Sequence, residues 1–287
     1  MRLTGTTHNH CTHCDGKLTA VQMADAAEAA GFTAFGFSSH SDPFCGNLNE
    51  RAYVEEILRL KSERKGRLDI LLGIEQDFFR PVENRAAFDY LIGSVHYIKG
   101  PKTGKLHPVD WGEKELQACL DEFDGDGIAM VRAYYALLEE NVRRFSPDVV
   151  GHFDLIVKNN ASGRFFDENS PDYRKAALHA LHVCIESGCI IEMNTGGVYR
   201  GYRETFYPAP FLLEELARLD GKVTLNADAH DAQGLCFGLS HALEQARKAG
   251  IGRIFMPSAN GFISKSIKDL PSAEKNGMIQ KEAQKTV

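Results

Sequence analysis

Residues 70–75 read Ile-Leu-Leu-Gly-Ile-Glu, an unbroken apolar run that ends on the carboxylate of Glu75. A short run of this composition predicts a strand that is buried on both faces, as strands of parallel sheets are. Similar short apolar runs lead to four other polar residues, namely His40, His96, His152 and Asp228. This recurrence indicates one repeated structural unit in which each strand ends near a possible metal ligand.

Helical patterns separate these runs. We expect strands at 32–38, 68–75, 149–152, 189–194, 222–227 and 253–256, and one that ends at His96. We expect helices at 19–30, 50–65, 124–145, 171–187, 210–219 and 238–249, and a loop at 99–113. Alternating strands and helices are typical of a parallel sheet. The fold class predicted is α/β, and the number of strands favours a distorted (β/α)7 TIM-like barrel, a single domain, over an open doubly wound sheet.

The amino-acid composition limits the classes of protein to which this chain could belong. The chain has 287 residues, of which 43% are hydrophobic and 25% charged, as in a soluble globule with a sizeable core. The net charge of −6 argues against a general nucleic-acid or membrane-surface binder. No apolar signal core or membrane-spanning run is present, so we expect a cytoplasmic protein. We expect the barrel to cover 1–270 and a polar C-terminal tail to follow at 271–287.

The strand ends carry a large set of possible metal ligands. The C-terminal ends of barrel strands converge on one face, where active sites form. His8 and His10 lie two residues apart and so share one face of an extended segment, and Asp228 and His230 repeat this spacing. Imidazole and carboxylate ligands without thiolate suit zinc, manganese or iron. The candidate ligands are His8, His10, Asp15, His40, Glu75, His96, His152, Asp228 and His230.

Other motifs are weaker. Cys11 and Cys14 have zinc-finger spacing but no second pair, and seven cysteines argue against a disulfide framework. His13 is left open as a ligand. Residues 100–105 imitate a phosphate-binding loop but are one residue short and lack the final Ser or Thr. Four basic residues near the expected mouth are candidates for binding a substrate phosphate: Lys158, Arg164, Arg200 and Arg203.

Seven segments together resemble one known family. They are HNHCTHCDG at 8–16, SSH at 38–40, GIE at 73–75, IGSVHYI at 92–98, GHFDLI at 151–156, EMNTGG at 192–197 and NADAH at 226–230. In this order they resemble the polymerase-and-histidinol-phosphatase (PHP) superfamily, most closely its histidinol-phosphate phosphatases. The chain departs from the usual pattern at Gly16 after Asp15, at Ser39 before His40 and at Ala227 before Asp228. These differences leave the expected ligands in place.

The resemblance implies a distorted (β/α)7 barrel that holds two or three divalent ions. By position, the first ion would be held by His8, His10, Glu75 and Asp228; the second by Asp15, His40 and His230; the third by Glu75, His96 and His152. Glu75 would then bridge two ions.

The function implied is hydrolysis of L-histidinol phosphate in histidine biosynthesis. Our mechanistic hypothesis is attack by a metal-bridging hydroxide on the phosphate ester, with Asp228 or His230 as catalytic residues that assist proton transfer. The alternatives are a phosphoesterase for nucleotide or sugar phosphates, an amide hydrolase, whose usual bridging lysine is not found, and a non-catalytic metal-binding module. The partner expected is a small-molecule phosphate ester, and the oligomeric state is left open.

Overall fold

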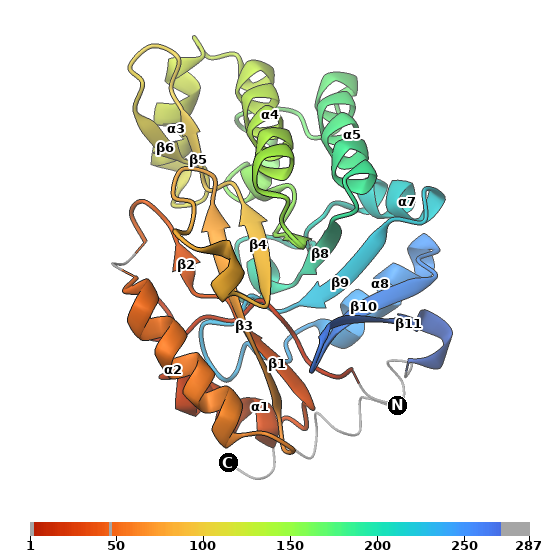
Figure 1. The fold of residues 1–287 in the computed structure, drawn as a ribbon. Helices are drawn as coiled ribbons and strands as arrows, with labels where there is room; N and C mark the ends of the chain where they lie inside the picture. The colour runs from red at the N-terminus through yellow and green to blue at the C-terminus, as the bar shows by residue number, and fades with distance from the viewer. Residues whose placement is uncertain (1–2, 46–47, 271–287) are drawn as a thin grey trace.

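A computed structural model describes residues 3–45 and 48–270 of the chain, and the expected tail at 271–287 lies outside them. Its main feature is a curled, nine-stranded sheet (Figure 1). In spatial order the sheet contains β1 (Ala34–Phe37), β3 (Asp69–Asp77), β4 (Tyr90–Ser94), β7 (Val149–Val150), β8 (Ile190–Asn194), β9 (Lys222–Asn226), β10 (Arg253–Ser258) and β11 (Gly261–Ser266), while β2 (His40–Ser41) pairs with β3. All neighbours are parallel except β10 and β11.

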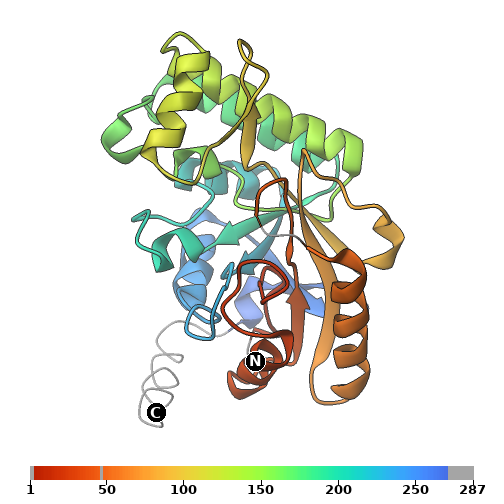
Figure 2. The same cartoon turned by 90° about the vertical axis from the view of Figure 1, so that its left-hand side faces the viewer.

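The N-terminal segment 4–10 lies between β1 and the chain that follows β9. On one side Gly36 N–H of β1 donates to Thr6 O (2.9 Å). On the other side His10 N–H donates to Ala229 O (2.8 Å), just beyond β9. The segment therefore extends the parallel pairing between β1 and the chain just beyond β9, where Asn9 forms a bridge to Ala229. In Figure 2 its red trace lies beside β1. The curled sheet, in which all pairs except β10–β11 are parallel, confirms the predicted α/β TIM-like class.

Helices cover the outside of the sheet (Figure 1). They are α1 (Ala20–Ala29), α2 (Glu50–Glu63), α3 (Glu113–Glu122), α4 (Gly127–Phe145), α5 (Pro171–Glu186), α6 (Gly196–Tyr199), α7 (Pro210–Arg218) and α8 (Leu239–Ala249), with short 3₁₀ turns at Arg85–Ala87, Leu155–Val157, Ala161–Gly163 and Ile267–Asp269. The side chain of Thr19 caps α1, as its sequence position predicts, and Asn49 caps α2. Within the described residues, no helix has both the length and the apolar character needed to cross a bilayer.

A tyrosine fills the interior of the barrel. Tyr90 of β4 is fully buried, and its hydroxyl donates to Phe37 O on β1 (2.8 Å). Its ring lies over Gly73, where an added Cβ would come within 2.0 Å of the ring. Gly73 is therefore required by close packing, since any side chain there would displace the tyrosine.

The segment expected to be a loop at 99–113 is more ordered than predicted. β5 (Tyr97–Lys99) and β6 (Leu106–Pro108) form a hairpin, and α3 begins where the loop was expected to end. The Glu122 carboxylate accepts hydrogen bonds from the backbone N–H groups of Lys102 and Thr103 (2.9 and 3.0 Å). The loop that imitates a phosphate-binding sequence thus surrounds a carboxylate of the chain itself. This partner lies 20 residues away from Lys102, so local sequence gave no sign of it.

Candidate metal centre

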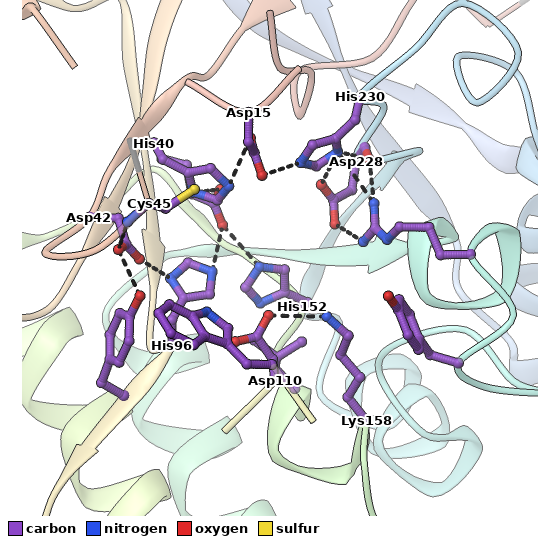
Figure 3. Close-up of a pocket in the computed structure, with 16 residues that line it drawn as sticks. Asp15, His40, Asp42, Cys45, His96, Asp110, His152, Lys158, Asp228 and His230 are labelled. Carbon is purple, nitrogen blue, oxygen red and sulfur yellow. Dashed lines mark hydrogen bonds and ion pairs between the residues drawn. The ribbon is translucent and has the colours of Figure 1, made fainter. Parts of the chain in front are cut away.

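The candidate ligands come from the carboxyl ends of the strands and from the N-terminal segment, and the fold brings them together. His40 lies in β2 and Glu75 in β3, while His96, His152 and Asp228 each lie two residues beyond a strand. Figure 3 shows six of the nine turned toward one open space: Asp15, His40, His96, His152, Asp228 and His230. The nine residues predicted from the sequence therefore form one cluster.

Glu75 is the centre of the cluster and is fully buried. Its Oε2 lies 3.2 Å from His8 Nε2 and 2.8 Å from His40 Nδ1. Its Oε1 lies 3.3 Å from His96 Nε2 and 2.9 Å from His152 Nε2. Because each oxygen faces a different set of imidazoles, the carboxylate could bridge two ions.

The side chains form overlapping groups whose ligand atoms lie within 4.8 Å of one another. These groups are His8–His10–Glu75, His10–Asp15–His40–His230, Glu75–His96–His152, His8–His152–Asp228 and His40–Asp42–His96. One equals the set expected for a third ion, and another contains the whole set expected for a second. Asp228 joins the first set, since its Oδ1 lies 3.3 Å from His10 Nε2.

The chemistry of the cluster fits divalent cations. Buried polar atoms nearly always have partners, yet His8 Nε2, His10 Nε2 and Glu75 Oε2 make no hydrogen bond. Burial, with the nearby His230 and His40, lowers the pKa of His10 to about 3, so its imidazole is neutral and free to coordinate. Burial opposes ionisation of Glu75, but the surrounding His40, His8 and His96 hold its pKa well below the usual range.

A cavity of about 340 Å³ opens onto the cluster. Of the four basic candidates, it contains Arg200 and Lys158. Arg164 lies outside the cavity, exposed and paired with Glu113. Arg203 also lies outside, because its guanidinium is bound to Glu168 (2.9 Å) and to Val157 O (2.9 Å). The sequence alone could not show which of these basic residues line the cavity, since the position of each side chain depends on partners that are distant in sequence.

Arg200 adjoins the cluster through Asp228. Its Nη2 lies 2.8 Å from Asp228 Oδ2, and its Nη1 donates to Asp228 O (3.0 Å). Burial raises the pKa of Asp228, but Arg200 and His8 outweigh it and hold that pKa well below the usual range. Asp228 is therefore an ionised carboxylate shared between the arginine and the imidazoles.

The cavity wall includes groups that the sequence analysis did not select. Asp110 Oδ2 binds Lys158 Nζ (3.1 Å), whereas its buried Oδ1 has no hydrogen-bond partner. Lys158 Nζ also lies 4.6 Å from the centre of the Tyr202 ring. Tyr202 and Trp111 line the same cavity and are more than half exposed. This wall thus combines a carboxylate, an ammonium group and an aromatic rim.

Two further buried acids hold His96. Asp77 Oδ2 accepts the His96 backbone N–H (2.9 Å) and lies 3.4 Å from its Nδ1. Asp42 Oδ2 lies 3.6 Å from the same nitrogen. Neither acid was predicted from the sequence. Asp77 follows Glu75 by two residues, and in a strand this spacing places Glu75 and Asp77 on one face.

The remaining sequence candidates lie beside the cluster. His13, left open above, is paired with Glu56 of α2 (Nε2 to Oε2, 2.6 Å). Cys14 Sγ lies 3.4 Å from His10 Nδ1, and Cys11 is buried. All seven cysteines are free thiols.

Comparison with known proteins agrees with this geometry. The model of the PHP domain family matches residues 6–196. A probable histidinol-phosphatase of Deinococcus radiodurans is 32% identical over 257 residues, which cover 84% of this chain and 90% of the relative. One of Schizosaccharomyces pombe is 26% identical over 294 residues, with 91% and 92% covered.

Among solved structures, the histidinol phosphate phosphatase of Lactococcus lactis in complex with zinc, L-histidinol and phosphate has a TM-score of 0.67 at 22% identity. The match covers 91% of this chain and 99% of that one, and it supports the fold. The family match spans more than half of the sequence and includes seven of the nine clustered ligands, from His8 to His152. The chain therefore belongs to the PHP domain family.

Proposed function

We propose that this protein is a metal-dependent phosphomonoester hydrolase that converts L-histidinol phosphate and water to L-histidinol and phosphate in histidine biosynthesis. The observation that carries the proposal is the cluster around Glu75, in which seven of the nine candidate ligands line one cavity and His8 and His10 lie buried beside it. The names of the relatives, which match over most of this chain, support the choice of substrate. We place the reaction in the cytoplasm.

In this proposal the clustered side chains hold two or three divalent ions of zinc, manganese or iron. Such ions lower the pKa of a coordinated water and neutralise charge on a phosphoryl group. His8, His10, Glu75 and Asp228 would hold one ion; Asp15, His40 and His230 a second; Glu75, His96 and His152 a third. The chain's own task is to gather these ligands in one place and to turn their ligand atoms toward one another.

Two residues at the cavity would act on the substrate. The planar guanidinium of Arg200 can donate two parallel hydrogen bonds to phosphoryl oxygens. His230 is partly exposed there, with Nδ1 3.0 Å from Asp228 O. From this position His230 would assist proton transfer to the leaving alkoxide, with Asp228 as the alternative.

The wall opposite the cluster fits the rest of the substrate. Histidinol phosphate carries an ammonium group and an imidazole ring besides its phosphate. The unpartnered Oδ1 of Asp110 can accept a hydrogen bond from the ammonium group. Trp111 and Tyr202 offer ring faces to the imidazole.

Replacing Asp110 by Asn should therefore change substrate preference. We expect kcat/KM for histidinol phosphate to fall by roughly 10-fold to 100-fold, because a charge-assisted hydrogen bond contributes about 1.5–3 kcal/mol. Hydrolysis of phenyl phosphate, which has no amine, should change by less than about threefold. Equal losses on both substrates in steady-state kinetics would show that Asp110 does not bind the amine.

Phosphate release from a panel of esters tests the function itself. The panel contains histidinol phosphate, phenyl phosphate, AMP and glucose 6-phosphate, each with the protein as purified, after chelation, and after zinc or manganese is restored. We expect histidinol phosphate to have the highest kcat/KM, and chelation to abolish turnover reversibly. A preference for AMP or glucose 6-phosphate would reassign the substrate. No turnover of any ester by protein with verified metal content would indicate a non-catalytic module.

A further inference from the structure

A buried carboxylate beneath the cluster has no role in the proposed reaction. Glu192 lies in β8, is fully inaccessible to solvent, and accepts from four donors. Its Oε1 lies 2.7 Å from His8 Nδ1 and accepts from Asn226 Nδ2 (2.8 Å). Its Oε2 accepts from the His152 backbone N–H (2.7 Å) and from Asn194 Nδ2 (2.9 Å). One side chain thus contacts two residues of the metal centre.

The neighbouring amides determine which way these hydrogen bonds run. Asn226 Oδ1 accepts from the Thr7 backbone N–H (2.7 Å), so its Nδ2 must face Glu192. Asn194 Oδ1 accepts from the Gly196 backbone N–H (2.8 Å), so its Nδ2 faces Glu192 as well. With the His152 N–H, three donors of fixed direction surround the two oxygens. Glu192 can therefore act only as an acceptor.

This arrangement decides the tautomer of His8. Because Glu192 only accepts, the neutral His8 ring that a metal ligand requires must carry its proton on Nδ1, and its lone pair is then on Nε2. That Nε2 points at Glu75 Oε2 (3.2 Å) and makes no hydrogen bond. Carboxylates that accept from the far nitrogen of a ligating histidine fix its ring and raise its basicity.

We propose that Glu192 is a positioning residue of the metal centre: it sets the tautomer and ring orientation of His8 and anchors the backbone that presents His152. By these two hydrogen bonds Glu192 connects His8, which belongs to one ligand group, with His152, which belongs to another. The inference rests on the metal centre of the proposed function.

The first test is zinc affinity measured by competition with a chromophoric chelator. Glu192→Gln has the same shape, but an amide offers one NH2 group in place of an acceptor oxygen. Whichever way the amide is turned, this NH2 group must face N–H donors of fixed direction. We expect zinc to bind about 10-fold to 100-fold more weakly, the usual loss when such a partner is removed. The matched control is Glu122→Gln, since Glu122, at the end of α3, is also a buried carboxylate among backbone and side-chain donors but contacts the loop between β5 and β6. Its zinc affinity should equal that of the wild type.

A double variant separates positioning from general damage to the fold. The Gln oxygen can still accept the His152 N–H, so the loss in Glu192→Gln should arise at His8, and this change should weaken zinc binding little further in a His8→Ala background. Additive losses, or wild-type affinity in folded Glu192→Gln, would overturn the inference. Zinc bound by neither wild type nor variant would refute the metal centre, and the inference with it.

A measurement on the unaltered protein covers the case in which Glu192→Gln does not fold. In zinc-loaded wild type, ¹⁵N-resolved NMR of the imidazoles should show His8 protonated at Nδ1, with the signal assigned by its loss in His8→Gln. A His8 ring without a proton on Nδ1 would contradict the inference.

Discussion

Replacing Glu75 by Gln should almost abolish phosphate release while leaving the protein folded. The amide keeps the size of the side chain and its contact with Ser94 (2.8 Å), but it loses the negative charge between five imidazoles. Two ligand groups share this carboxylate, so both are affected. Metal ions supply several kcal/mol of transition-state stabilisation, and we expect kcat to fall by roughly 10³-fold to 10⁴-fold.

The control for this variant lies on the same strand. Asp69→Asn makes the same change from acid to amide at the exposed beginning of β3, far from the carboxyl end. It should leave kcat unchanged in assays of histidinol phosphate with saturating zinc. A Glu75→Gln variant that has normal metal content and retains more than about a tenth of wild-type kcat would show that the Glu75 carboxylate is not needed for turnover.

Arg200→Ala and Arg203→Ala should differ strongly in activity, although both arginines follow the same strand in sequence. Arg200 lies in the cavity beside Asp228, where its charge can stabilise the phosphoryl group. Removing one such preorganised donor costs about 10²-fold to 10³-fold in rate, and we expect this loss for Arg200→Ala. Arg200→Lys should restore little, because an ammonium group cannot form the two parallel bonds.

Arg203→Ala should instead act on stability. Its guanidinium bridges Glu168 and Val157 O outside the cavity, so its loss removes a structural contact. We expect kcat/KM to change by less than about fivefold and the melting temperature to fall by a few degrees. Equal kinetic losses for the two alanine variants, measured with histidinol phosphate, would contradict the placement of the phosphate beside Arg200.

The strand pattern made most of the fold and the ligand cluster predictable. Apolar runs before Glu75, His96 and His152 are local signals, and parallel strands place their carboxyl ends on one face whatever the intervening sequence. The position of the N-terminal segment was not predictable, since its partners Gly36 and Ala229 are distant in sequence and lie in no local pattern.

The residues that support the ligand cluster could not be predicted from the sequence, for the same reason. Glu192 lies 184 residues from His8 and 40 residues from His152, and only the folded chain brings them into contact. The choice between Arg200 and Arg203 depends on which acid each one meets, Asp228 or Glu168. Sequence spacing indicates which strand end a residue follows, but burial and pairing are properties of the tertiary structure.

The most direct test is an anomalous difference map at the zinc absorption edge, from a crystal of this protein grown with zinc and phosphate. We predict two or three zinc peaks among the ligand groups that meet at Glu75, with phosphate oxygens next to them and within hydrogen-bonding distance of Arg200. Zinc found only at surface histidines or cysteines, with none beside Glu75, would contradict the account.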